Sequence, residues 1–174
     1  MNKMKKKVCR FLYYHFAIYL PVSKRCFGIG KKMRVFLCKN IFEYIGKDVN
    51  IEKGARFGGG EHIRIGDRSG LGINCNIPDG SIIGKYVNMG PNCFVHSRNH
   101  CFDRVDIPMQ QQGYTQNKPI VIDDDVWIGR DVTIMIGRHI SEGSVIAANC
   151  VLTKDFPPYS VVGGNPGCFI KSRQ

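Results

Sequence analysis

A six-residue repeat runs through this chain from residue 45 onward, and it restricts the possible folds more than any other feature. The repeat falls into blocks of three, six and five units, and all 14 units open with an apolar side chain. Leu152 begins a further, partial unit. The opening residues are Ile45, Ile51, Phe57, Ile65, Leu71, Ile77, Ile83, Met89, Val95, Ile122, Ile128, Ile134, Ile140 and Ile146.

Two other positions of the unit follow rules of their own. The fifth residue is small in 11 of the 14 units, with Glu61, Asn99 and Arg138 as exceptions. The second residue is glycine in seven units, as expected where the backbone is left-handed or crowded. The small residues are Val49, Ala55, Ser69, Cys75, Ser81, Val87, Cys93, Val126, Val132, Ser144 and Cys150, and the glycines are Gly46, Gly58, Gly66, Gly72, Gly84, Gly90 and Gly129.

A period of six does not match the 3.6-residue turn of an α-helix, and glycine costs about 1 kcal/mol at each helical site. The pattern instead predicts short strands joined by corners, with three sides to each coil. The 14 units then make nearly five coils. Coils that stack at roughly 4.8 Å bury a column of isoleucines that no single coil covers. The predicted fold class is an all-β solenoid over residues 45–174.

Residues 1–44 precede the repeat, and we expect them to form a basic helical cap over the open edge of the first coil. One helix is predicted over residues 8–20, where Pro21 stops it, and a second over residues 31–44. The apolar residues that the second helix places on one face are Met33, Phe36, Leu37, Ile41 and Tyr44.

The net charge of +11 is concentrated in this head. Residues 1–47 hold 12 Lys or Arg and one acidic residue, whereas the remaining 127 residues hold 13 of each sign. This distribution argues against nucleic acid as a partner, because a nucleic-acid-binding domain carries its basic residues on the globular surface.

Membrane contact, if any, is expected to be peripheral. The longest apolar stretch, residues 11–20, is about half of what a transmembrane helix needs. We therefore expect a cytoplasmic protein. A further hypothesis is that the basic head draws it to anionic lipid at the inner face of the membrane, and the alternative is a cap in contact with water alone.

Residues 96–121 interrupt the repeat, and a long excursion from a regular coil is usually functional. The excursion opens with the densest chemistry in the chain, HSRNHCFD at residues 96–103. The eight cysteines include no C-x-x-C pair, so a zinc ribbon is not indicated. Cys75, Cys93 and Cys150 are expected to be small buried residues rather than catalytic ones.

Four further motifs occur in order: NHCFD at 99–103, IVIDDDVWIG at 120–129, VLTKDFPPYSVV at 151–162 and GGNP at 163–166. Over about residues 45–171 this set resembles the hexapeptide-repeat acyltransferases, and among them the galactoside, maltose and polysaccharide O-acetyltransferases. The resemblance implies a left-handed parallel β-helix and a homotrimer, with acetyl-CoA bound between neighbouring subunits. It also implies acetyl transfer to a hydroxyl of a sugar or polysaccharide precursor, with no metal.

The same resemblance assigns site residues. His100 matches the family's catalytic histidine, and an imidazole suits the activation of a weakly nucleophilic hydroxyl near neutral pH. Asn76 and Asp79 fall where the family contacts the acceptor, although a rung-stacking Asn and a turn Asp explain them equally well. For acetyl-CoA the family pattern maps onto Ala148, Thr153 and Lys154, and Trp127 is expected to form a wall near His100. Arg130 and Lys171 are positioned to meet phosphate, and the alternative for each is an exposed charge that keeps the protein in solution.

Two departures from the family leave the acceptor open. Cys168 stands where relatives often carry a basic residue, and the head is basic where the galactoside and maltose enzymes have an acidic cap. An acyltransferase for an amino sugar, an antibiotic or serine is therefore an alternative. Two others are a non-catalytic scaffold and a zinc enzyme similar to the gamma carbonic anhydrases, for which His96 and His100 have no third partner in register.

Overall fold

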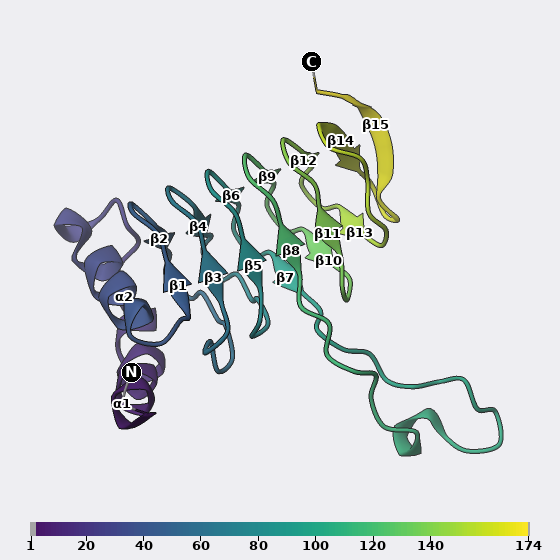
Figure 1. Cartoon of the computed structure of the whole chain (residues 1–174), viewed down its shortest axis with the longest axis horizontal. Helices are drawn as coiled ribbons and strands as arrows, with labels where there is room; N and C mark the ends of the chain where they lie inside the picture. The colour runs from purple at the N-terminus through teal and green to yellow at the C-terminus, as the bar shows by residue number, and fades with distance from the viewer. Residues whose placement is uncertain (1–2, 174) are drawn as a thin grey trace.

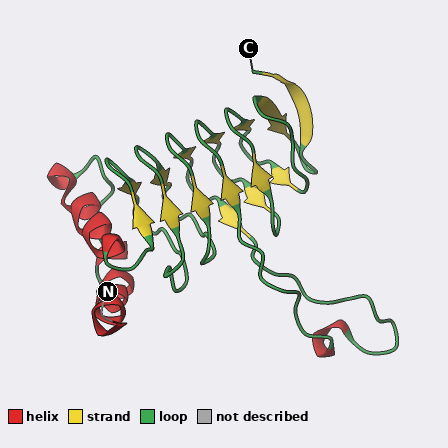
Figure 2. Ribbon diagram, viewed as in Figure 1, coloured by secondary structure: helices red, strands yellow, loops and turns green. Residues whose placement is uncertain are grey.

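The protein consists of a helical region set against one end of a long coil of short strands (Figures 1 and 2). Its structure is a computed structural model that describes residues 3–173. The helical region comprises α1 (Lys3–His15), η1 (Ala17–Tyr19), η2 (Cys26–Gly28) and α2 (Ile29–Lys39). The coil is a β-solenoid of about six turns, which confirms the predicted β-helix with a short helical region before it.

Three sides of the coil carry parallel strands. The first sheet is ordered β1 (Tyr44–Ile45), β3 (Arg64–Ile65), β5 (Ile82–Ile83), β8 (Val121–Ile122), β11 (His139–Ile140), and the second β7 (Phe94–Val95), β10 (Thr133–Ile134), β13 (Val151–Leu152). The third is ordered β6 (Asn88–Met89), β9 (Trp127–Ile128), β12 (Val145–Ile146), β14 (Ser160–Gly163), β15 (Cys168–Ser172). A separate pair joins β2 (Asn50–Ile51) to β4 (Gly70–Leu71).

The C-terminal part extends the coil further than the nearly five turns that the repeat predicts. After Leu152 the chain makes a bridge from Phe156 to Ile140 and then pairs β14 with β12, although the six-residue pattern is lost. β15 closes this end by pairing antiparallel with β14. The extra length therefore comes from residues that continue the coil without its sequence signature.

The interior follows the predicted register. From Ile51 to Ile146 every residue at the first position of a unit is at most 5 % exposed, and only Ile45 is partly buried. The small fifth-position residues are all buried, including the three cysteines. Equivalent positions stack directly, since Ile65 pairs with Ile83 and Ile83 with Ile122 across the excursion. The core is therefore a continuous apolar column.

The left-handed backbone lies at the fourth position of the unit, and the second position is crowded instead. Every fourth-position residue has a positive φ except Arg98, which lies in the excursion, and apart from Arg68 and Tyr86 they are Asp, Asn or Gly. Of the second-position glycines only Gly58 has a positive φ. At Gly72 an added Cβ would lie 2.1 Å from the carbonyl oxygen of Gly90 on the next coil. Stacking thus explains most of these glycines.

The predicted helices are wrong in extent and, for the second, in its buried face. α1 spans Lys3–His15 rather than 8–20, and α2 ends at Lys39 because Glu43 and Tyr44 already donate backbone hydrogen bonds to Ile63 of the next coil. Of the predicted face only Leu37 and Ile41 are buried. The face of α2 that packs inward consists of Gly30, Arg34, Leu37 and Cys38.

Arg34 fixes this orientation, because its side chain is fully buried between the head and the first complete coil. Its Nε donates to the carbonyl oxygen of Ile51 at 2.7 Å, and its Nη atoms donate to the carbonyl oxygens of Leu20 at 2.9 Å and Pro21 at 3.1 Å. Glu52 lies 3.9 Å from the guanidinium. Arg34, one of the basic residues counted in the head, is therefore buried and joins the head to the coil.

We expect Gly72→Ala to lower the free energy of unfolding by at least about 3 kcal/mol, because the new Cβ has no room between stacked backbones. The matched control is Gly59→Ala, whose Cβ would meet only side-chain atoms at 3.5 Å or more. Urea unfolding at one fixed protein concentration measures both. Equal stability of the two variants would contradict the crowding argument.

Replacing Arg34 by Met keeps much of the volume but leaves backbone carbonyl oxygens without a donor. The expected loss of unfolding free energy is about 2–4 kcal/mol. Lys32→Met, on the exposed side of the same helix, is the control and should change stability by less than about 0.5 kcal/mol. Thermal and urea unfolding report both values, and a neutral Arg34→Met variant would show that the guanidinium is dispensable.

Candidate functional site

The excursion begins after β7 and projects away from the coil as two antiparallel arms (Figure 1). The arms are joined by backbone hydrogen bonds from Thr115 to Asn99 and from Cys101 to Gly113. A 3₁₀ turn, η3 (Met109–Gln111), lies near its tip. Val105 is 100 % exposed, so the outer part of the excursion has no packing partner within residues 3–173.

His100 lies on one arm of this excursion and is exposed. It forms a backbone bridge with Tyr114 on the other arm, and the two ring centroids are 4.2 Å apart. The guanidinium carbon of Arg98 lies 4.3 Å from the centroid of the same tyrosine ring. Within residues 3–173, no hydrogen bond joins the His100 imidazole to another predicted site residue. The histidine is held by its own loop and faces outward.

The predicted acceptor residues lie together at the base of the excursion. Asn76 and Asp79 line a hollow of about 380 Å³ whose other wall includes His96, Ser97 and Arg98. His100 does not line this hollow. Two of the predicted residues are therefore brought together, but the proposed base stands apart from them.

Both carboxylate oxygens of Asp79 already have partners within the protein. Its Oδ1 accepts hydrogen bonds from the backbone N–H of His62 at 2.9 Å and of Gly80 at 3.0 Å. Its Oδ2 lies 3.2 Å from Nδ1 of His62. These contacts join one coil to the next. The sequence left two roles open for Asp79, contact with the acceptor and a place in a turn, and the contacts favour the turn.

Trp127 and Lys171 lie together on the third sheet. They line a hollow of about 490 Å³ with Tyr86, Asn88 and Arg173 among its other walls. The indole of Trp127 is 57 % exposed. Arg173 is tethered through Nη1 to Asp125 Oδ2 at 2.8 Å. This hollow combines an aromatic wall with two cationic side chains, which suits a ligand that has both planar and anionic parts.

Of the other predicted coenzyme A residues, Arg130 and Ala148 lie at the corner between the third and second sheets, and Thr153 and Lys154 lie beyond the second. Ala148 precedes β13, and Thr153 and Lys154 follow it, all three exposed. Gly129 packs so closely that an added Cβ would lie 2.6 Å from the Ala148 nitrogen. Arg130, at the same corner, forms an ion pair with Asp131 at 2.9 Å.

The predicted ligand residues thus fall on two sides of the coil. Trp127 and Lys171 belong to the third sheet, whereas Thr153 and Lys154 follow the second. Different sides of a closed coil face different directions, so a ligand that touched all of these residues of a single chain would have to extend around the coil. His100 belongs to the excursion that follows β7, and to neither of these two sides. One chain therefore places the predicted ligand residues in separate groups.

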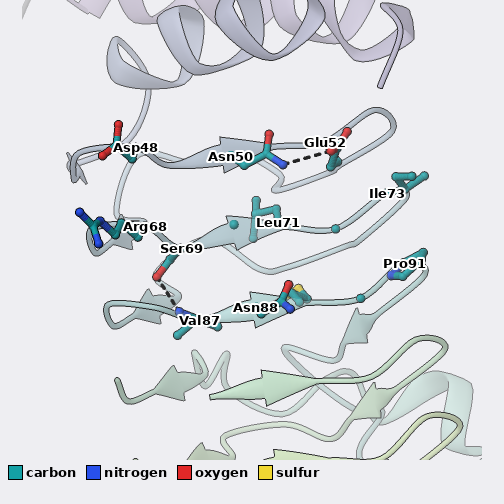
Figure 3. A pocket seen from close by; sticks show the side chains of 14 residues that line it. Asp48, Asn50, Glu52, Arg68, Ser69, Leu71, Ile73, Val87, Asn88 and Pro91 are labelled. Atoms are coloured by element: carbon teal, nitrogen blue, oxygen red, sulfur yellow. Dashed lines mark hydrogen bonds between the residues drawn. The ribbon is translucent and has the colours of Figure 1, made fainter. Parts of the chain in front are cut away.

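A third hollow was not predicted from the sequence. It has a volume of about 390 Å³ and lies over β2, β4 and β6, where glycines at 70, 72 and 90 leave the backbone without side chains (Figure 3). Asn50 donates from Nδ2 to Glu52 at 3.0 Å, and its buried Oδ1 has no hydrogen-bond partner among the described residues. Asn88 lines both this hollow and the one beside Trp127, so the two adjoin.

Glu52 in this hollow is held ionised by its neighbours. Burial alone would raise the pKa of its carboxyl group, but hydrogen bonds from Ser23 and Asn50 outweigh burial and lower it. Gly72 and Gly90, which both line this hollow, stand at the second position of units one coil apart, and this spacing was the signal that could have predicted a surface without side chains. Among residues 3–173 there is no group of three or more His, Cys, Asp or Glu arranged to hold a metal ion.

Comparison with known proteins gives consistent relatives. No protein-family model matches the chain. A putative acetyltransferase of Schizosaccharomyces pombe is 36% identical over 118 residues, which are 67% of this chain and 56% of that protein. The chain spans roughly half to two thirds of the length of the curated relatives that it matches first.

Solved structures match over nearly the whole chain. A hexapeptide-repeat acetyltransferase of Vibrio cholerae is 30% identical, with a TM-score of 0.81, covering 99% of this chain and 92% of that one. The same protein has also been solved with acetyl-CoA. A galactoside acetyltransferase in complex with coenzyme A is 28% identical, with a TM-score of 0.78, over 98% of this chain and 82% of that one. By sequence and by fold, this chain belongs to the hexapeptide-repeat acetyltransferase family.

Proposed function

We propose that this protein is an acetyl-CoA-dependent O-acetyltransferase whose acceptor is a hydroxyl of a sugar or polysaccharide precursor. The observation that carries the proposal is the agreement, over 99% of the chain, with an acetyltransferase solved with acetyl-CoA. The sugar acceptor is supported by the likeness to a galactoside acetyltransferase.

His100 is proposed as the general base. A sugar hydroxyl is a poor nucleophile at neutral pH, and its attack on a thioester requires a group that accepts the proton. As the O–C bond forms, the hydroxyl proton passes to the imidazole and a tetrahedral oxyanion develops on the acetyl carbonyl. Collapse of this intermediate breaks the C–S bond, and the imidazolium returns its proton to the leaving thiolate. No covalent acetyl-enzyme is needed, and no step calls for a metal.

A homotrimer is proposed as the active form, because a second chain completes what one chain leaves apart. Trp127 and Thr153 lie on different sides of the coil, and an excursion that projects from one chain can bring His100 to a neighbour. In this arrangement acetyl-CoA lies between two subunits. Ala148, Thr153 and Lys154 of one chain would hold it, and Trp127, Arg130 and Lys171 would supply an aromatic wall and positive charge.

The proposed place of action is the cytoplasm, with the basic head in contact with anionic lipid. Eight of the basic residues of the head are exposed: Lys3, Lys5, Lys7, Lys24, Arg25, Lys32, Lys39 and Lys47. Such a contact would bring the enzyme to saccharides that are built on lipid carriers.

The direct test is a thiol-release assay with acetyl-CoA against a panel of sugars, lipid-linked saccharides, amino sugars, antibiotics and serine. Acceptor-dependent release with a saccharide supports the proposal. Release only with an amino sugar, an antibiotic or serine would replace the acceptor class, and stoichiometric zinc in the purified protein would replace the mechanism.

We expect His100→Ala to lower kcat by roughly 10²- to 10⁴-fold while the size of the assembly is unchanged. His15→Ala, an exposed histidine of α1, is the matched control and should keep full turnover. Steady-state kinetics and sedimentation velocity measure the two properties. Unchanged turnover in His100→Ala would remove this residue from the mechanism.

Asp79→Ala separates the two roles of that carboxylate. Loss of the bonds to His62 and Gly80 should lower the free energy of unfolding by about 1–3 kcal/mol. If Asp79 acts through its turn alone, KM for the saccharide measured well below the unfolding temperature stays within about twofold of the parent value. A large rise in KM with unchanged stability would instead place the carboxylate at the acceptor.

A further inference from the structure

Helix α1 carries apolar residues beside its buried side as well as on it. Cys9 and Tyr13 face the core, and the Tyr13 hydroxyl donates to the carbonyl oxygen of Ala55 at 2.8 Å. Outside these contacts, the exposed fractions of Val8, Phe11 and Leu12 are 50, 55 and 39 %. These three residues are called the outer stripe. At 100° per residue they share one face of the helix.

The outer stripe is surrounded by positive charge. Lys3, Lys5 and Lys7 are exposed on the same helix, and the sequence has no acidic residue before Glu43. A soluble helix normally turns a charged face to water, so an apolar stripe between lysines is the pattern of a helix at a membrane interface.

A second exposed apolar group occurs in the same head. Phe27 is 96 % exposed in the η2 turn, between Lys24 and Arg25 on one side and Lys31 and Lys32 on the other. Both helices lie beyond the first strands of the solenoid, at the end opposite β15 (Figure 1). The excursion leaves the coil away from this end (Figure 1). The head does reach the edge of the hollow beside Asp79, because the Tyr14 hydroxyl donates to the carbonyl oxygen of Gly58, which lines it.

The positive charge of the head indicates which kind of partner can cover the outer stripe. A second copy of the head would bring two basic surfaces together, because the positive excess of the whole chain resides in residues 1–47. Arg34 is buried and does not contribute, but the other basic side chains of the head lack enough acidic partners to neutralise them. An anionic surface neutralises the lysines and covers the outer stripe at once.

We propose that α1 is an interfacial helix that lies on an anionic phospholipid bilayer, with the outer stripe at the acyl boundary and its lysines among the headgroup phosphates. The inference deepens the lipid contact within the proposed function, since it requires insertion as well as charge attraction. No helix within residues 3–173 is long and apolar enough to cross a bilayer. A trimer would present three such helices and bind correspondingly tighter.

The test is co-sedimentation of the full-length protein with vesicles of phosphatidylcholine, with or without about one third phosphatidylglycerol. We expect binding to the anionic vesicles only. Val8→Ser with Phe11→Ser should weaken that binding on the order of tenfold, because both side chains leave the acyl boundary. Lys5→Glu with Lys7→Glu should weaken it by a similar factor and reduce its salt dependence.

The matched control is Val105→Ser with Phe102→Ser, which removes a Val and a Phe that are more exposed than those of the outer stripe and should leave vesicle binding unchanged. Circular dichroism and unfolding confirm that each variant folds. Equal binding of the parent and the Val8→Ser, Phe11→Ser variant would overturn insertion, and absence of parent binding to anionic vesicles would overturn the lipid surface altogether. If the assembly of the outer-stripe variant has half the mass of the parent assembly, a second copy of the chain covers the stripe, and the lipid proposal is overturned.

This outcome is independent of the acetyl-transfer proposal. Thiol release with a water-soluble acceptor, measured without vesicles, should be the same in the parent and the outer-stripe variant. Loss of vesicle binding with intact thiol release would therefore concern the surface alone, whereas vesicle binding without thiol release would contradict the enzyme and leave the surface standing.

Discussion

The rest of this structure depends on the close stacking of one coil on the next. Backbones that approach within strand spacing leave no room for a Cβ at certain corners, as at Gly72, where the next coil's carbonyl oxygen would lie 2.1 Å away. The same stacking turns one apolar residue per side into a continuous column and restricts the neighbouring inward position to small residues. The spacing thus explains the three positional rules of the repeat, and the positive φ at the fourth position supplies the turn between sides.

A stacked coil has an open first edge, and the helical head covers it. The connection depends on a buried cation, because Arg34 donates to carbonyl oxygens of the head and of Ile51 together. Tyr13 and Tyr14 add hydroxyl contacts to the second and third units of the repeat. With its inner side used in this way, the head turns its remaining apolar residues and most of its lysines outward.

The geometry of the coil also decides how a site can form. A prism with three sides distributes its outward residues in three directions, so that Trp127 lies on the third side and Thr153 follows a strand of the second. The excursion is the element that leaves the prism (Figure 1), and its residues 96–121 include His100. The proposed homotrimer would bring these separated residues together between subunits.

The sequence by itself determined the parallel β-helix, the identity of its core residues and the position of the excursion, because these follow from a short period repeated along the chain. It could place His100, Asn76 and Asp79 only through a resemblance, and it could not show that Asp79 is bonded to His62. Only the tertiary structure decided the buried face of α2, the role of Arg34, which apolar residues of α1 stay exposed and the separation of the predicted site residues over different sheets. Each of these depends on contacts between segments distant in the chain, and a local pattern cannot show which of two apolar faces finds a partner.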